Sequence, residues 1–194
     1  MIGKYKQKLN PVILIIARPF KGVDPNILTL LGLIPPILFY YFISIGEYGW
    51  ALVSMAGVVL DTLDGAVARL SGKESKFGGI LDSVLDRISD SIFIAGFAVA
   101  GLVSFEIAMF LMVQSATISY IRARAGSENV EVKNGLIERP ERLLLIALSL
   151  LVYILAPDFL YLEMNLPTWG FMILNVLSLV TIIQRINKSY KLLS

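Results

Sequence analysis

The sequence contains no cysteine and no histidine among its 194 residues, and only 16% of the residues are charged. The lack of cysteine excludes disulfide scaffolds, zinc-thiolate sites and thiol nucleophiles, and the lack of histidine excludes imidazole acid-base catalysis. Any bound metal ion must therefore be held by oxygen atoms. The formal net charge of +2 is too small to indicate nucleic-acid binding, so we expect no nucleic-acid partner.

Apolar residues are abundant instead: they make up 56% of the chain, and the mean hydropathy is +0.74. Such a composition excludes a large soluble domain. A membrane-spanning helix needs roughly 20 apolar residues, so six helices would use about 120. We expect an all-α integral membrane protein with one domain over 1–194, its six-helix bundle covering 27–187. The predicted spans are 27–45, 49–69, 79–103, 106–124, 142–162 and 168–187, and Pro35-Pro36 should kink the first.

Residues 1–21 combine basic side chains with apolar ones at helical spacing, which predicts an amphipathic helix on the membrane surface. A cleaved signal peptide is the alternative, but the apolar run from Val12 to Ala17 is short and Arg18 follows it. The loops at 46–48, 104–105 and 163–167 contain no lysine or arginine. By the positive-inside rule, we expect a multi-pass protein of the cell membrane with both termini in the cytoplasm.

Five aspartates lie inside the second and third predicted spans, where an ionised carboxylate is costly unless it faces water, pairs with a cation or binds a metal. Asp61 and Asp64 are three residues apart in the second span, and Asp82 and Asp86 are four apart in the third. Each pair therefore shares one helical face. Two antiparallel helices with a short connection could direct all four carboxylates to one point. Asp90 lies one turn deeper and is left out of this set.

A buried ion pair with Arg69 or Arg87 is the alternative explanation for any single aspartate. One or two arginines cannot neutralise four carboxylates, whereas two divalent cations can. Because only oxygen ligands are present, Mg²⁺ or Mn²⁺ is favoured over zinc or copper.

The run Asp61-x2-Asp64-Gly65-x2-Ala68-Arg69-x8-Gly78-x3-Asp82-x3-Asp86 resembles the signature of the CDP-alcohol phosphotransferase family, without departure at any fixed position. The resemblance extends to the amphipathic N-terminal helix and six spans, and it implies a homodimer. Members displace CMP from a CDP-linked lipid with the hydroxyl of an alcohol. The resemblance implies that the four aspartates bind two divalent cations and that Asp86 deprotonates the alcohol. Since a metal-bound carboxylate is a poor base, Asp86 could instead orient that hydroxyl. Contacts to the CDP-lipid are implied for Asn26, Thr29, Gly65, Arg69 and Ser75.

A second group of residues bears on the acceptor alcohol: arginine, never lysine, stands at positions 122, 124, 139, 142 and 185. Anchoring to lipid phosphates would explain any one of them. As a set they favour a bidentate anion pocket. They also resemble the branch of the family that uses inositol phosphate, which implies that the acceptor's phosphate contacts Arg122, Arg124, Arg142 and Arg185. That branch often has lysine where Arg122 stands, and Glu138 and Glu141 would orient the arginines.

We therefore expect an enzyme of phospholipid biosynthesis. It would transfer a phosphatidyl or archaetidyl group from a CDP-linked membrane lipid to inositol 1-phosphate and release CMP. One alternative is the same reaction with glycerol 3-phosphate. The other is an ion-conducting membrane bundle in which the acidic stripe lines a permeation path.

Overall fold

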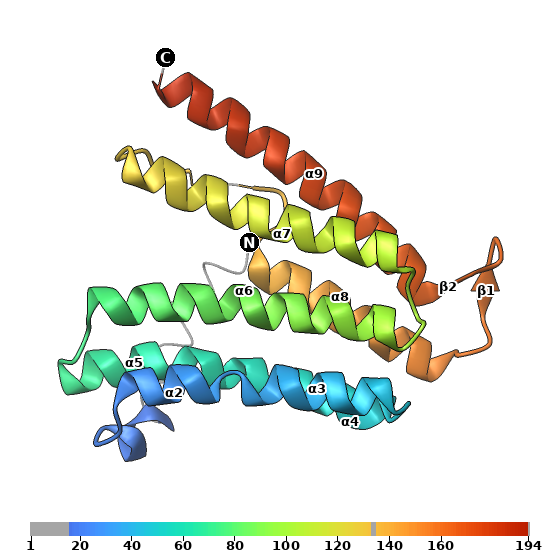
Figure 1. The fold of residues 1–194 in the computed structure, drawn as a ribbon, viewed down its shortest axis with the longest axis horizontal. Helices are drawn as coiled ribbons and strands as arrows, with labels where there is room; N and C mark the ends of the chain where they lie inside the picture. The colour runs from blue at the N-terminus through green and yellow to red at the C-terminus, as the bar shows by residue number, and fades with distance from the viewer. Residues whose placement is uncertain (1–15, 133–134, 194) are drawn as a thin grey trace. The chain divides into compact units, whose positions relative to one another are not determined.

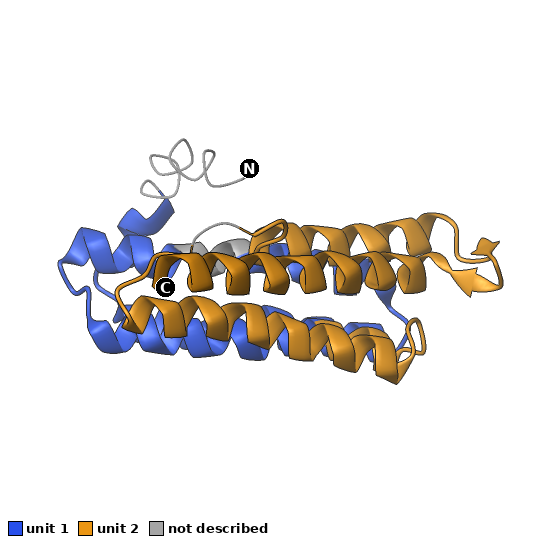
Figure 2. Ribbon diagram, turned by 90° about the horizontal axis from the view of Figure 1, so that it is seen from above, with its two compact units in different colours: residues 1–93 blue, residues 94–194 orange. Residues whose placement is uncertain are grey.

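The computed structural model describes residues 16–132 and 135–193, except for the side chains of 59–62. Most of the predicted amphipathic helix at 1–21 lies outside the described residues, and its described end is a short 3-10 helix, η1 (Arg18–Phe20). The chain divides into two compact units, residues 1–93 and 94–194 (Figure 2). The division falls inside one long helix, α6 (Lys76–Val99).

The first unit contains the two helices that carry the aspartates of the motif (Figure 1). Its elements are α2 (Pro25–Leu31), α3 (Ile34–Ser44), α4 (Tyr48–Ala56), the 3-10 helix η2 (Gly57–Leu60), α5 (Asp61–Ser71) and the larger part of α6. The predicted interruption near Pro35-Pro36 is confirmed, because α2 ends before Gly32 and α3 begins at Ile34. Both prolines then stand in the first turn of α3, where their missing N–H groups cost little.

The second predicted span is not one continuous α-helix, since η2 separates α4 from α5. Gly57 ends α4, and a Cβ there would lie only 2.7 Å from the Cγ atom of Pro35. Only glycine allows this approach of η2 to α3. The break places Asp61 at the first position of α5 and Asp64 one turn later.

The second unit contains α7 (Phe105–Ser127), α8 (Arg139–Leu155) and α9 (Leu166–Leu193), and both α7 and α8 pack against α9. The predicted fifth span at 142–162 extends too far, because α8 ends at Leu155. A hairpin of β1 (Leu160–Tyr161) and β2 (Met164–Asn165) follows. The two residues between its strands have left-handed φ angles of 50° and 62°.

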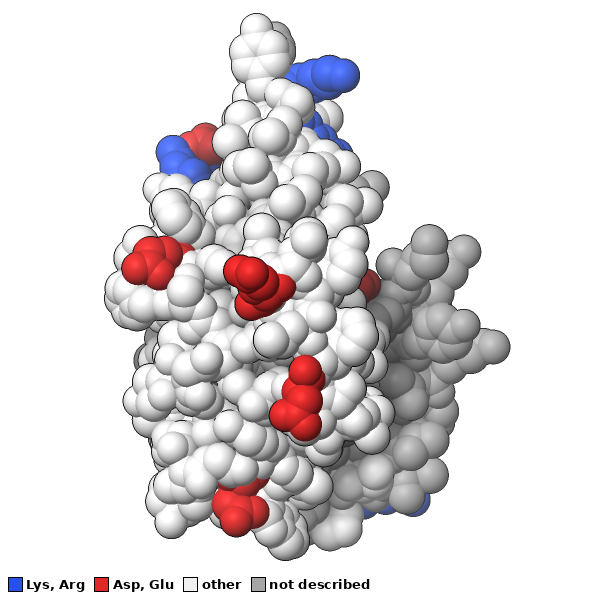
Figure 3. Space-filling model, turned by 90° about the vertical axis from the view of Figure 1, so that its right-hand side faces the viewer, with Lys and Arg blue, Asp and Glu red and all other residues white. Residues whose placement is uncertain are grey.

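Large apolar side chains are exposed on helices of both units, among them Ile37, Trp50, Phe110, Leu155 and Val176. The face in Figure 3 is mostly uncharged, and its charged side chains form isolated patches. Exposed apolar surface of this extent is typical of a protein embedded in lipid. Within the part of the chain that the structure describes, two helical stretches, Pro25–Ser44 and Leu166–Leu193, are long and apolar enough to cross a membrane. The all-helical fold class is confirmed, while the six crossings remain a prediction.

Candidate functional site

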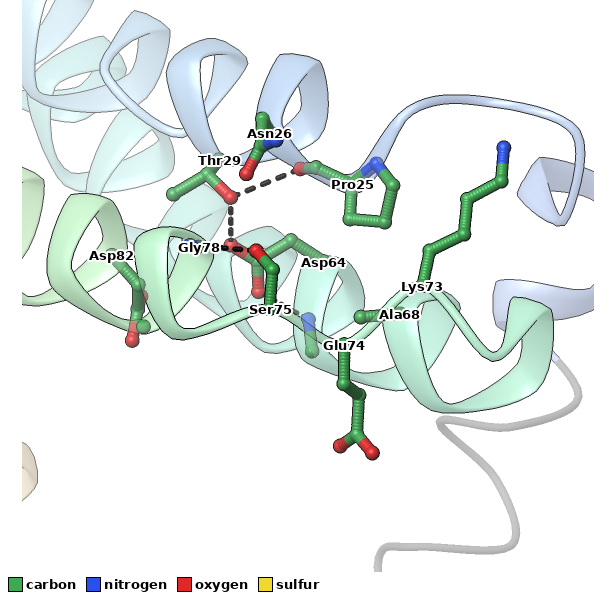
Figure 4. A pocket seen from close by; sticks show the side chains of 12 residues that line it. Pro25, Asn26, Thr29, Asp64, Ala68, Lys73, Glu74, Ser75, Gly78 and Asp82 are labelled. Carbon is green, nitrogen blue, oxygen red and sulfur yellow. Dashed lines mark hydrogen bonds between the residues drawn. The ribbon is translucent and has the colours of Figure 1, made fainter.

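A cavity of about 190 Å³ opens between α2, α5 and the start of α6 (Figure 4). It contains many of the residues that the sequence selects, and it lies wholly within the first unit. It is lined by Pro25, Asn26, Thr29, Asp64, Gly65, Ala68, Lys73, Glu74, Ser75, Gly78, Gly79 and Asp82.

Two helix starts meet at this cavity, and the local sequence explains both. Asp24 caps α2, because its carboxylate accepts a hydrogen bond of 2.9 Å from the N–H of Asn26. Ser75 stands just before α6, and its hydroxyl accepts a 2.9 Å hydrogen bond from the N–H of Gly78. A Cβ on Gly78 would lie 3.1 Å from Ser75 Oγ and 3.3 Å from Asn26 Oδ1. Glycine at this position therefore lets the two helix starts approach each other.

Asp64 is buried and held from two sides. Its Oδ2 atom lies 2.6 Å from the hydroxyl oxygen of Thr29, and its Oδ1 atom accepts a hydrogen bond from the N–H of Gly65. The Thr29 hydroxyl also lies 3.0 Å from the carbonyl oxygen of Pro25. A hydroxyl has one hydrogen, and the shorter contact to an anionic oxygen is the stronger hydrogen bond. Thr29 on α2 therefore fixes the carboxylate of Asp64 on α5, as Figure 4 shows.

The other aspartates lie along the same two helices. Asp82 lines the cavity, and Asp86 is half-buried one turn further along α6. Asp61 begins α5, but its side chain is not among those described. Among the described side chains, no three acidic groups are close enough to hold a metal ion. The structure brings Asp64 and Asp82 to one cavity, and this all-oxygen donor set fits a hard divalent cation.

Arg69 lies over Gly65 from the next turn of α5. A Cβ on Gly65 would lie 3.5 Å from the Nη1 atom of Arg69, an ordinary van der Waals contact, so the guanidinium lies beside Gly65 without filling the space of a Cβ. Lys73 and Glu74 also line the cavity, although sequence reasoning did not select them. Figure 4 shows both side chains directed away from its centre. Their only signal in the sequence is their place in the loop before Ser75.

The predicted acceptor residues lie in the second unit, and they do not form one uniform cluster. Arg142 and Arg185 are buried, with 1% and 2% of their surface exposed. The Nη1 atom of Arg185 donates a 2.8 Å hydrogen bond to the carbonyl of Ile118, and its Nη2 atom lies 3.7 Å from the Glu138 carboxylate. Arg122 and Arg142 are both close enough to repel the charge of Arg185. Glu138 attracts Arg185 and offsets part of this repulsion, and a bound anion would offset more of it.

Arg124 differs from these three because its guanidinium is bound near the end of its own helix. It forms a 2.6 Å ion pair with Glu128 and a 2.6 Å hydrogen bond to the hydroxyl of Ser127. It also lines an open groove between the carboxyl-terminal turns of α7 and α9. The structure thus brings Arg122, Arg142 and Arg185 within electrostatic range and gives Arg124 other partners.

Comparison with known proteins decides the family. The model of the CDP-alcohol phosphatidyltransferase family matches residues 23–183, which include every described residue that lines the cavity. The chain belongs to this family. The family expected from the aspartate motif is therefore confirmed, and so is the expectation of an enzyme.

Relatives within the CDP-alcohol phosphatidyltransferase family cover most of the chain. An archaetidylinositol phosphate synthase of Pyrococcus horikoshii is 36% identical over 174 residues, covering 88% of this chain and 85% of the relative. A phosphatidylinositol phosphate synthase of Mycolicibacterium smegmatis is 36% identical over 178 residues, covering 86% and 77%.

Solved structures match the fold as well. The phosphatidylinositol phosphate synthase of Mycobacterium tuberculosis with CDP-DAG bound has a TM-score of 0.80 at 28% identity, covering 93% of this chain and 94% of that one. The same enzyme in complex with manganese and citrate has a TM-score of 0.79 at 29% identity, covering 92% and 88%. A relative of the same fold thus takes a divalent metal, in agreement with the all-oxygen donor set described above.

Proposed function

We propose that this enzyme transfers a phosphatidyl or archaetidyl group from a CDP-linked lipid to inositol 1-phosphate and releases CMP. The observation that carries the proposal is the meeting of Asp64, Asp82, Asn26 and Ser75 at one cavity, in a chain whose relatives are inositol phosphate synthases. The names of these relatives favour inositol phosphate over glycerol 3-phosphate as the acceptor. Membership of an enzyme family leaves no support for an ion-conducting bundle.

In the proposed reaction, the acceptor hydroxyl attacks the lipid-linked phosphorus of the CDP-lipid. A new P–O bond forms to inositol phosphate, the P–O bond to CMP breaks, CMP leaves with the bonding electron pair, and the hydroxyl proton is released to solvent. Asp61, Asp64, Asp82 and Asp86 would hold two divalent cations, Mg²⁺ or Mn²⁺, which supply charge stabilisation for the pyrophosphate and its leaving group.

Protein groups around the cavity would bind and orient the CDP-lipid. Thr29 and the N–H of Gly65 fix the Asp64 carboxylate before substrate arrives. Asn26, Ser75 and the Arg69 guanidinium over Gly65 then present polar groups to the cytidine diphosphate. Thr29 therefore acts mainly through Asp64, a role that differs from the direct lipid contact expected from the sequence.

We assign the acceptor hydroxyl to Asp86, whose position on α6 is one turn from Asp82. As a hydrogen-bond acceptor, its carboxylate would orient the hydroxyl oxygen for in-line attack. Metal binding lowers the basicity of a carboxylate, so orientation is its main contribution and proton removal a lesser one.

The acceptor's phosphate would be bound by Arg122, Arg142 and Arg185, with Arg124 joining if it leaves Glu128. The support for this assignment is electrostatic: Arg122 and Arg142 both repel the buried Arg185. A phosphate would remove that repulsion and accept charge-assisted hydrogen bonds. Glu138 limits the positive charge while the site is empty and helps to hold Arg185.

We further propose a homodimer by likeness to the family, and a protein that crosses the membrane six times with both termini in the cytoplasm. Since the chain has no cysteine, single cysteines can report this topology directly. A cysteine at Lys73 should react with a membrane-impermeant maleimide from the cytoplasmic side, and one at Glu47 only from outside. Labelling of position 47 from the cytoplasm would overturn the topology.

The experiment that tests the proposed function measures CMP release by the purified protein. CDP-diacylglycerol and CDP-archaeol are each offered with inositol 1-phosphate, glycerol 3-phosphate and unphosphorylated inositol. We expect rapid CMP release only with inositol 1-phosphate. Preference for glycerol 3-phosphate would overturn the acceptor assignment, and no CMP release with any pair would overturn the reaction.

A further inference from the structure

The loop that precedes α8 is fixed by two side chains of α9. The N–H of Ile137 donates a 3.1 Å hydrogen bond to the hydroxyl of Thr181, and the N–H of Leu136 donates a 3.0 Å hydrogen bond to the Oε1 atom of Gln184. Two consecutive peptide groups of a loop are thus held by side chains three residues apart on one helix. Neither side chain belongs to the aspartate signature or to the arginine set.

Gly135 shows how closely this loop lies on α9. A Cβ at this glycine would overlap the Cγ2 methyl of Thr181 and would lie 3.4 Å from the Nε atom of Arg185. No other residue type fits here without movement of the loop or the helix. The loop therefore contacts Thr181 and Arg185 at the same point.

Arg185 stands one helical turn after Thr181, so the same loop limits where its guanidinium can lie. One side of that group donates to the carbonyl of Ile118 on α7, and the other faces Glu138 at the end of the loop. The Nε atom of Arg185 is buried and has no hydrogen-bond partner among the described residues. The guanidinium is thus fixed while one buried donor remains available.

We propose that Thr181 and Gln184 are positioning residues for the acceptor's phosphate site, a role that rests on the proposed function. They hold the segment 135–138 against α9, and this segment holds Glu138 and Arg185 in the arrangement that receives the phosphate. Neither residue touches the substrate. They act by keeping the guanidinium of Arg185 in place.

The hydrogen bonds of Thr181 make its role testable by isosteric substitution. Its side chain is fully buried, and its hydroxyl donates 2.8 Å to the carbonyl of Leu177 while it accepts from Ile137. Thr181→Val keeps the shape and the methyl contact with Gly135 but cannot accept the loop's N–H. Thr181→Ser keeps the hydroxyl. Thr117 on α7 offers a matched control, because its hydroxyl also donates 2.8 Å to its own helix, at Val113.

The test measures KM for inositol 1-phosphate and for the CDP-lipid separately in purified Thr181→Val, Thr181→Ser and Thr117→Val. One lost neutral hydrogen bond should raise the acceptor KM of Thr181→Val about threefold to tenfold. We expect the CDP-lipid KM to stay within about twofold, Thr181→Ser to recover most of the loss, and Thr117→Val to behave as wild type. Equal losses for both substrates, or no difference between Thr181→Val and Thr117→Val, would overturn the proposal.

Two further measurements keep the outcome decisive. Gln184 is exposed, so Gln184→Ala should fold even if Thr181→Val does not, and it should raise the same KM about twofold to fivefold. In a double-mutant cycle, the free-energy change calculated from the acceptor KM of the double variant Thr181→Val, Arg185→Lys should be smaller than the sum of the changes in the two single variants. Additive effects would mean that Thr181 does not act through Arg185.

If the wild type prefers glycerol 3-phosphate, the proposed function fails, but the same comparison of KM values made with that acceptor still tests the positioning role.

Discussion

The aspartate cavity and the arginine cluster, which consists of Arg122, Arg142 and Arg185, differ in how the chain builds them. The cavity uses residues from 25 to 82, and helix caps and one short loop place most of them. The arginine cluster joins the carbonyl of Ile118, the segment 135–138 and Arg185, which tertiary packing alone brings together. Most of the first site therefore follows from local spacing, and the hydrogen bond between Thr29 and Asp64 is its long-range contact. The second depends on long-range contacts and is more sensitive to changes outside its charged residues.

The largest effect should come from the carboxylates of the cavity. Asp82→Asn should lower turnover at least about a hundredfold, because it removes a charge that balances a bound cation near the reacting phosphate. The matched control is Asp158→Asn, an exposed aspartate of the loop after α8, which should keep wild-type turnover. CMP release is measured with Mg²⁺, with Mn²⁺ and in excess chelator. Full turnover in chelator would contradict metal dependence.

Substitutions in the arginine cluster should have the next largest effect, and this effect should be on the KM for the acceptor alcohol. Arg142→Ala removes a buried, charge-assisted contact worth about 1.5 to 3 kcal/mol, so the acceptor KM should rise roughly tenfold to hundredfold. Arg142→Lys should recover part of the loss, since lysine keeps the charge but not the planar fork.

The control for Arg142→Ala is Arg124→Ala. Because the guanidinium of Arg124 is paired with Glu128, its removal should raise the acceptor KM less. Kinetics with both substrates separate the two sites. Equal loss of affinity for the CDP-lipid and for the acceptor in Arg142→Ala would refute the assignment of this cluster to the acceptor.

A smaller effect should follow from loss of the hydrogen bond between α2 and α5. Thr29→Val removes the hydroxyl that lies 2.6 Å from Asp64 Oδ2. The apparent affinity for Mn²⁺ should fall about tenfold, as is typical when a partner that orients a metal ligand is lost. Titration of Mn²⁺ by electron paramagnetic resonance measures this without turnover. Thr29→Ser should retain wild-type affinity, and unchanged affinity in Thr29→Val would show that Asp64 needs no such support.

Local sequence predicted much of the first unit and less of the second. Asp, Gly and Pro at fixed spacing define helix starts and shared faces, so the aspartate motif and the break near Pro35-Pro36 could be read directly. The 3-10 segment η2 could not be read in this way, because it accompanies a close approach of Gly57 to Pro35, which are far apart in sequence. The early end of α8 was missed because the apolar residues of the hairpin resemble a continuing span.

The same difference between local spacing and long-range contacts explains why the sequence did not separate Arg124 from the other arginines. The sequence predicted a shared role for Arg122, Arg124, Arg142 and Arg185. Spacing along a chain, however, does not predict which groups a long side chain will contact. The structure pairs Arg124 with Glu128, which follows the last residue of the same helix. Thr181 gives no signal at all in the sequence, since a threonine in an apolar helix usually bonds only to its own backbone.

The smallest predicted effect tests the close approach at the cavity. Gly78→Ala would place a methyl group 3.1 Å from Ser75 Oγ and 3.3 Å from Asn26 Oδ1, so both side chains would have to move. The CDP-lipid KM should rise about threefold. Alanine is also a better helix former than glycine by roughly 1 kcal/mol, so thermal stability should not fall.

Gly49 is the matched control for Gly78, because it stands in the first turn of α4 and a Cβ there meets nothing within 4 Å. Gly49→Ala should leave the CDP-lipid KM unchanged while giving the same gain in helix propensity. The decisive observation is a rise in KM without a loss of stability in Gly78→Ala alone. If Gly78→Ala and Gly49→Ala have the same KM, then Asn26 and Ser75 do not need their observed positions to bind the CDP-lipid. Binding of that substrate would then rest on Arg69 and the carboxylates.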